Sequence, residues 1–286
     1  MESARTLRPG DGQYPDALAR IAERPAELRV RGSIGERRRV ALVGSRHPDE
    51  YGTDLTRTIA GGLAQAGLTV VSGGALGIDA EAHEAALAAG GHTVAVLGTG
   101  VDVAHPSRHR DLFERILTSG GALVSELPDG TPGLPHHFPR RNRIVSGLSE
   151  AVLVVRAGER SGALITAAWA RTQGVPVLAV PGDVRDPLSA GTTALLREGA
   201  RAVATAADVL AELGLDAPAE RQLELPRLAG EEAALLAALA RRPRHADEVA
   251  RVAGLAPGAA LAGLLALELR GLCEQRPGHY FVRRSG

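Results

Sequence analysis

The sequence is poor in the residues that build disulfides, thiolate metal cages and lysine-based phosphate sites. Cys273 is the only cysteine, so an intrachain disulfide and a thiolate cage are both excluded. No lysine occurs, which removes the residue that completes a P-loop. No apolar run approaches the ~20 residues needed to cross a bilayer, and the N-terminus lacks the layout of a signal peptide. We therefore expect a cytoplasmic protein with no membrane partner.

The chain also lacks an excess of charge and has few aromatic residues. Its 33 basic residues, all arginine, balance 33 acidic ones, so a nucleic-acid site would have to be a local patch. With only three Phe, three Tyr and one Trp, each aromatic in a polar, glycine-rich setting carries more weight than usual. The 286 residues suffice for one large α/β domain and a small satellite.

Short apolar runs alternate with glycine-rich turns and amphipathic stretches from residue 39 to residue 213. We predict strands at residues 40–43, 69–72, 93–97, 122–125, 151–155 and 175–180. The helices predicted between and after them are 49–66, 78–89, 106–119, 141–148, 162–172, 191–198 and 206–213. Strands that alternate with helices at these spacings require a parallel sheet covered on both faces.

The remaining segments are shorter. Residues 1–38 are predicted to form a helical lead-in packed on the main domain, and residues 214–227, rich in Pro, Ala and charge, a linker. Residues 228–286 contain three short helical patterns followed by a hairpin pattern. That order is typical of a winged helix-turn-helix domain.

Glycine-rich turns follow the predicted strands, which places them on one rim of the sheet. In an open α/β sheet the carboxyl ends of the strands form the ligand crevice. Glycines there let backbone amides approach an anion closely, and Arg46 would supply charge beside the first turn. We therefore expect a phosphate-rich ligand. The turn residues are Gly44, Ser45, Ser72, Gly73, Gly74, Gly77, Gly98, Gly100, Ser161, Gly162 and Gly182.

The segment Phe138-Pro139-Arg140-Arg141-Asn142-Arg143 combines an aromatic ring with a basic cluster. Arginine presents a fork of donors suited to phosphate oxygens, and a phenyl ring offers a face on which a base can stack. Pro139 is expected to start a turn, so that the helix follows it. This combination suits a nucleic-acid strand; the alternative is a solvated helix start with Phe138 packed in the core.

Cofactor, metal and catalytic sites are less well supported. The dinucleotide fingerprint is incomplete, because Gly44-Ser45-Arg46 follows the first strand. Asp79 and His83, one helical turn apart, could join His92 or His105 around a metal, but we favour a structural role. Glu126 could be a base; we favour a charge that holds nearby arginines. We expect no cofactor and no metal.

Six ordered motifs resemble the DNA-processing protein A (DprA/Smf) family of bacteria. The resemblance runs in unbroken order from about Tyr14 to Ala200, and the helix–hairpin tail matches that family's C-terminal winged-helix domain. The motifs are Val43 to Arg46, residues 72–83, Ser125-Glu126, Phe138 to Arg143, residues 161–167 and Pro181-Gly182.

The resemblance implies an extended Rossmann-like domain that binds single-stranded DNA in natural transformation. It further implies protection of the incoming strand, loading of the RecA recombinase onto it and a homodimer. Arg46 and the turn 72–77 would contact phosphates, and Phe138 would stack on a base. The nucleic-acid-binding residues expected are Gly44, Ser45, Arg46, Ser72, Gly73, Gly74, Gly77, Phe138, Arg140, Arg141, Asn142, Arg143, Arg156, Ser161 and Gly162.

The chain departs from the family pattern at three positions. His105-Pro106 stands where Tyr-Pro is usual, Arg156 where an acidic residue is common, and Thr193 where an asparagine is usual. We interpret Arg156 as additional positive charge on the rim.

Two other classes stay open: a nucleotide-binding enzyme of the related phosphoribohydrolase fold, and a nucleotide-sensing transcription regulator. Pro181-Gly182-Asp183 breaks the marker of the former. The predicted recognition helix near residues 257–270 offers almost nothing to a base edge, which argues against the latter. We expect a binding protein and not an enzyme.

Overall fold

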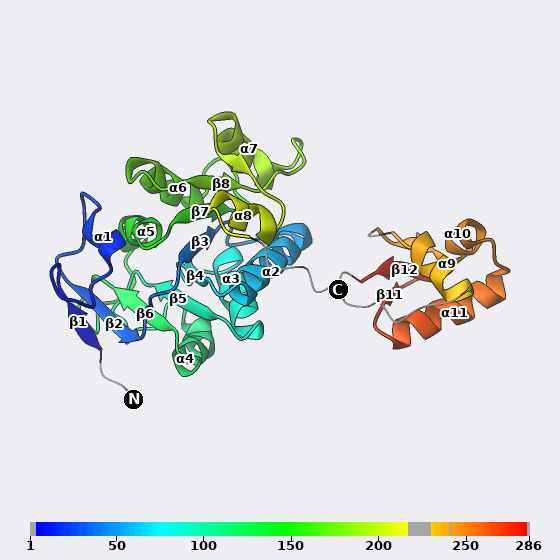
Figure 1. Ribbon diagram of the computed structural model, residues 1–286, viewed down its shortest axis with the longest axis horizontal. Coiled ribbons are helices and arrows are strands. Elements are labelled where there is room, and N and C mark those ends of the chain that lie inside the picture. The colour runs from blue at the N-terminus through cyan, green and yellow to red at the C-terminus, as the bar shows by residue number, and fades with distance from the viewer. Residues whose placement is uncertain (1–3, 217–229, 241, 285–286) are drawn as a thin grey trace. The chain divides into compact units, whose positions relative to one another are not determined.

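The computed structural model describes residues 4–216, 230–240 and 242–284. The chain divides into two compact units, Met1–Pro218 and Ala219–Gly286, which are described separately (Figure 1). Most of the predicted linker, residues 214–227, lies outside the described residues.

The first unit contains a nine-stranded sheet. Strands β3 to β9 form a parallel sheet, while β1 and β2 join its β6 edge in antiparallel pairing. The strands in sheet order are β1 (Arg5–Leu7), β2 (Leu28–Gly32), β6 (Ala122–Ser125), β5 (His92–Val96), β4 (Thr69–Ser72), β3 (Arg39–Val43), β7 (Ala151–Val154), β8 (Val177–Ala179) and β9 (Arg201–Ala202).

The predicted helical lead-in is wrong for most of its length. In the described part of this segment, residues 4–38, the only helix is the short α1 (Asp16–Ala19), which lies between strands β1 and β2. The reason is visible in β2, where the buried Leu28 and Val30 alternate with the less buried Arg29 and Arg31. A period of two favours a strand with one covered face, and this strand extends the sheet beyond β6.

Helices cover both faces of the sheet, as predicted. Side chains of β3 alternate between two apolar clusters: Ala41 and Val43 face one, Val40 and Leu42 the other. Figure 1 shows α5 and α6 on one side of the sheet and α2 and α3 on the other. The helices are α2 (Glu50–Gln65), α3 (Ile78–Ala88), α4 (Arg110–Thr118), α5 (His137–Gly147), α6 (Gly162–Thr172), α7 (Ala190–Arg197) and α8 (Ala206–Glu212), with 3₁₀ turns η1 (Ser107–His109) and η2 (Pro187–Ser189).

The order of the strands reverses at β3. From β3 the chain adds β4, β5 and β6 on one side, then returns to place β7, β8 and β9 on the other. The carboxyl ends of β3 and β7 therefore flank a topological switch point, where open α/β sheets usually bind ligands.

The second unit has winged-helix architecture around its own apolar core, which includes Leu235, Leu264 and Phe281. The predicted hairpin is present, and a further short strand pairs with it to give the order β10-β12-β11. The elements are α9 (Glu231–Ala238), β10 (Arg244–His245), α10 (Ala246–Ala253), α11 (Pro257–Leu269), β11 (Cys273–Arg276) and β12 (Tyr280–Arg283). Among the described residues no single helix could span a membrane; α10 and α11 reach the required length and hydropathy only together, across a 104° bend.

Candidate nucleic-acid interface

A pocket opens at the carboxyl ends of β3, β4 and β5, beside the switch point. Its lining combines one exposed arginine, the glycine-rich turn after β4, and aromatic rings from two further segments. The lining residues are Arg46, Gly73, Ala75, Leu76, Gly98, His105, Pro106, Phe138 and Arg141.

In the turn after β4, some backbone amides are hydrogen-bonded to Asp79 and others are hydrogen-bonded to no described residue. Asp79 accepts hydrogen bonds from the amides of Gly73, at 3.1 Å, and Ala75, at 3.3 Å, which fixes the turn from within. The amides of Gly74, Leu76 and Gly77 make no hydrogen bond to any described residue. They lie next to the N-terminus of α3, where orphan N–H groups and the helix dipole favour an anion. Asp79 is therefore structural, as favoured from the sequence.

Two glycines of this turn are required by close packing. Gly77 adopts φ +73°, and a Cβ there would lie 2.4 Å from the carbonyl oxygen of Ser45. A Cβ on Gly73 would lie 2.4 Å from Nη1 of Arg141. The first turn is joined to the second by the amide of Ile78, which donates to the Ser45 oxygen at 3.1 Å. The two turns are thus held together by a backbone hydrogen bond and by close packing.

The arginines of the candidate site differ sharply in exposure. Arg46 is exposed and pairs with no described side chain. Arg140 is exposed and lies 3.3 Å from Glu126. Arg141 is buried and donates from Nη1 to the carbonyl oxygens of Gly73 and Val96. Burial lowers the pKa of Arg141 to about 10, against the opposing attraction of Asp79, so the guanidinium keeps its charge at neutral pH directly beneath the turn.

Arg143 does not reach the rim, contrary to the sequence-based expectation. Its buried guanidinium forms two bonds to the carboxylate of Glu126, at 2.7 and 2.8 Å, and a third to the Glu23 carbonyl at 2.8 Å. The interpretation of Glu126 as a charge that holds nearby arginines is confirmed. Arg143 is committed to internal partners, and we therefore do not propose it as a phosphate contact.

Phe138 lies in the first turn of α5 and not in a loop before it. The helix starts at His137 because a proline, here Pro139, is tolerated in the first turn of a helix. The Phe138 ring is half-buried and packs against Gly98, where a Cβ would lie 2.7 Å from Cδ1 of the ring. Its other neighbour is His105, at 5.0 Å between ring centroids. Phe138 is thus neither a core residue nor a free loop side chain, and it borders the pocket.

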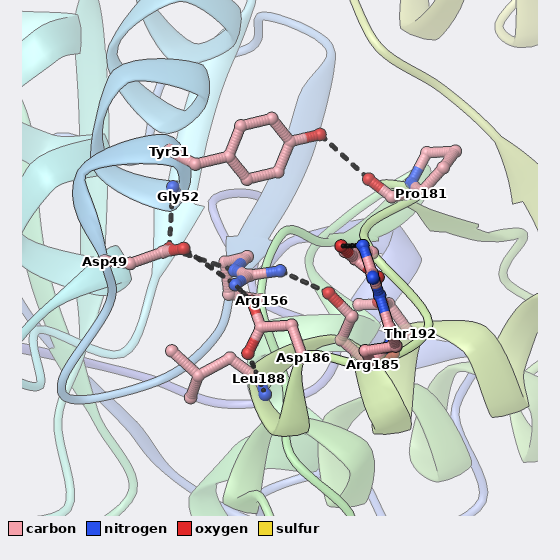
Figure 2. Close-up of polar contacts among 11 residues, drawn as sticks. Asp49, Tyr51, Gly52, Arg156, Pro181, Arg185, Asp186, Leu188 and Thr192 are labelled. Atoms are coloured by element: carbon pink, nitrogen blue, oxygen red, sulfur yellow. Dashed lines mark hydrogen bonds and ion pairs between the residues drawn. The ribbon is translucent and has the colours of Figure 1, made fainter.

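Arg156 is also buried, so it does not add free charge to the rim (Figure 2). Its guanidinium binds Asp49 through two bonds of 3.0 and 2.8 Å, and it also binds Asp186 and Ser189. Its carbonyl accepts from the amide of Ser45 at 2.7 Å. Arg156 and its partners therefore fill the switch point itself, and the open pocket lies to one side, towards β4 and β5.

The other expected residues take different places. Ser72 is buried and donates to the Leu42 carbonyl at 2.6 Å, so it cannot meet a ligand. Gly44 and Ser45 are half-buried. Asn142 donates to the carbonyl of Gly162 at 3.3 Å, and Ser161 caps α6 by accepting from the Ala163 amide at 3.3 Å. Asn142, Ser161 and Gly162 thus lie together on the β7 side of the rim.

The residues considered above as metal ligands do not form a cluster. His83 bonds to the Thr93 hydroxyl at 2.7 Å, and His92 bonds to the Thr69 hydroxyl at 2.9 Å. Within the described part of the chain no three His, Cys, Asp or Glu side chains could together hold a metal. His105 lines the pocket instead. The one sequence signal for this residue was the His105-Pro106 pair, which stands where Tyr-Pro is usual in the family.

These features define a Rossmann-like protein with a glycine-rich, arginine-bearing rim and a separate winged-helix domain. The chain belongs to the DNA recombination-mediator protein A family, whose profile matches residues 5–214, and the DprA winged-helix profile matches residues 217–279.

Several relatives are similar over most of the chain. Protein Smf of Escherichia coli is 41% identical over 98% of this chain and 78% of its own. The crystal structure of DprA from Streptococcus pneumoniae has 40% identity and a TM-score of 0.70 over 74% of this chain and 75% of its own. DprA of Helicobacter pylori, described for its single-stranded DNA binding mode, has 28% identity and a TM-score of 0.66 over 73% of this chain and 95% of its own.

Proposed function

We propose that this chain binds single-stranded DNA in the pocket between the β3, β4 and β5 turns. The observation that carries the proposal is the convergence of three elements on one pocket: the unpaired Arg46, the unused amides at the start of α3, and the ring of Phe138. The single-stranded DNA binding described for the Helicobacter pylori relative supports it.

Each element has a distinct role in this proposal. A phosphate would accept hydrogen bonds from the free amides of Gly74, Leu76 and Gly77 and pair with Arg46. The buried charge of Arg141 would add attraction from below without touching the strand. A base would stack on the aromatic surface at Phe138, a contact that every base can make. Binding would therefore be nearly independent of sequence.

We propose a binding protein and not an enzyme. Among the described residues that line the pocket there is no carboxylate, serine, threonine or cysteine. Asp79 is turned inward to the amides of Gly73 and Ala75, and Glu126 is bound by Arg143. Neither carboxylate has the hydrogen-bond reach that a general base needs. His105 lines the pocket and could accept a proton, but no serine, threonine or cysteine stands beside it among the described lining residues to serve as its nucleophile. Such a site is suited to hold a phosphodiester and not to break it.

Family membership supports a wider proposal. The bound strand would be incoming DNA in natural transformation, protected by this protein and handed to RecA, with the protein acting as a homodimer in the cytoplasm. Arg46→Ala should then abolish stimulation of RecA filament formation together with strand binding. Full stimulation by a variant that no longer binds DNA would contradict this part of the proposal.

The test is an equilibrium titration of single-stranded, duplex and mononucleotide ligands. We expect single strands to bind most tightly and Arg46→Ala to weaken them strongly. Arg37→Ala is the matched control: Arg37 is also exposed, but it precedes the amino end of β3, whereas Arg46 follows the carboxyl end. Equal affinity for duplex and single strand, or equal losses in the two variants, would contradict the proposal.

A further inference from the structure

We propose that His105 is a second base-stacking residue, which forms a two-ring platform with Phe138. The inference rests on the proposed single-stranded DNA binding and names the surface that a base meets. It concerns a residue that enters the pocket from the segment after β5, separate in sequence from the basic segment of α5.

The two rings form a tilted aromatic pair. Their centroids are 5.0 Å apart and their planes are inclined by 31°, within the range in which aromatic rings attract each other. His105 is exposed, whereas Phe138 is half-buried. His105 is therefore the outer ring of the pair, and Phe138 supports it from the side of α5.

Two glycines hold the pair in place. A Cβ on Gly133 would lie 3.1 Å from Nδ1 of His105 and 3.1 Å from Cζ of Phe138. A Cβ on Gly98 would lie 2.7 Å from the Phe138 ring. The backbone thus approaches both rings closely enough to limit their movement. A platform that is ordered before binding loses less conformational entropy when a base arrives.

The polar atoms of His105 have no structural task. Neither ring nitrogen hydrogen-bonds to a described residue, whereas the rings of His83, His92 and His109 each bond to a hydroxyl or a carbonyl. The charged groups that line the pocket with His105 are Arg46 and Arg141, both cationic. An exposed ring with free nitrogens, in a pocket with two cations, is placed to contact a base and its phosphate.

The test compares three substitutions at this position in the full chain. The probe is a single-stranded oligonucleotide that carries 2-aminopurine, whose fluorescence is quenched by stacking. His105→Ala and His105→Gln should each weaken binding by about 5- to 150-fold, the range that loss of one base–aromatic stack produces. His105→Phe, which keeps a ring, should retain the affinity within a few fold and keep the quenching. His105→Ala should lose part of the quenching.

The outcomes separate this inference from the proposed function. If the unaltered protein binds no single strand, the proposed function fails and the inference fails with it. If binding is present and weakened by Arg46→Ala and Phe138→Ala, but His105→Ala binds as well as or better than the unaltered protein, only the inference is overturned. Thermal melting of each variant confirms that the comparison is made between folded proteins.

Discussion

Arg156 allows a sharp test of which arginines are structural and which bind the strand. Its guanidinium is 2% exposed and pairs with Asp49 and Asp186, whose side chains are 38% and 32% exposed. Substitution by alanine removes the shared cation of two carboxylates and the contact of its Cγ with Gly52. We therefore expect a loss of stability without a loss of phosphate contacts.

The expected loss follows from the exposure of the partners. Removing one member of a fully buried ion pair costs about 3–5 kcal/mol because the other charge is left without water. Asp49 and Asp186 are both partly hydrated, so we expect Arg156→Ala to lower the free energy of unfolding by about 2–3 kcal/mol. Arg185 is the matched control, next to Asp186 in the chain: it is 88% exposed, and among the described residues its side chain pairs only with Asp183. Arg185→Ala should leave the free energy of unfolding nearly unchanged, because an exposed ion pair contributes little to stability.

Denaturant titration of both variants measures the stability change, and oligonucleotide binding at several salt concentrations measures the phosphate contacts. Arg156→Ala should leave the salt dependence of binding unchanged once measured on folded protein. A stable Arg156→Ala variant whose salt dependence is reduced would show that Arg156 binds the strand, and our assignment would be wrong.

Two further predictions concern the aromatic site and a buried histidine. Phe138→Ala should cost about 1–3 kcal/mol of single-strand affinity in the same titration; unchanged affinity would remove Phe138 from the site. Burial lowers the pKa of His83 to about 3, so the unfolded chain binds one more proton below the ordinary histidine pKa. The free energy of unfolding should consequently fall by up to about 1.4 kcal/mol per pH unit below pH ~6.5. His83→Gln should reduce the pH dependence of the free energy of unfolding, measured by denaturation at pH 4.5–7. An unchanged pH dependence would show that His83 does not cause the loss of stability.

The parallel sheet could be predicted because its strands are short apolar runs. Val40–Val43 of β3 and the whole of β7 are buried on both faces, and strands in such a position are continuous in apolar residues. The start of α5 was misplaced because Pro139 was expected to start a turn ahead of the helix, although proline also fits a first helical turn. Strand β2 was missed because only a few alternating residues mark it.

The site was predicted in outline only. Arg46 and the turn after β4 follow their strands directly, so the topology fixes their position. The burial of Arg143 and Arg156 depends on carboxylates that are distant in sequence: Glu126 is 17 residues from Arg143, and Asp49 is 107 residues from Arg156. An arginine that is free to bind phosphate and one that is neutralised look alike in the sequence. Only the fold shows which carboxylates lie next to each arginine.

The salt dependence of single-stranded DNA binding by the unaltered protein, Arg46→Ala and Arg37→Ala tests the central claim most directly. Each phosphate contact contributes about −0.7 to the slope of log K against log salt. Arg46→Ala should therefore flatten the slope by about 0.7 and weaken binding, while Arg37→Ala leaves the slope unchanged. If Arg46→Ala keeps the full slope and affinity, the strand does not bind at this pocket.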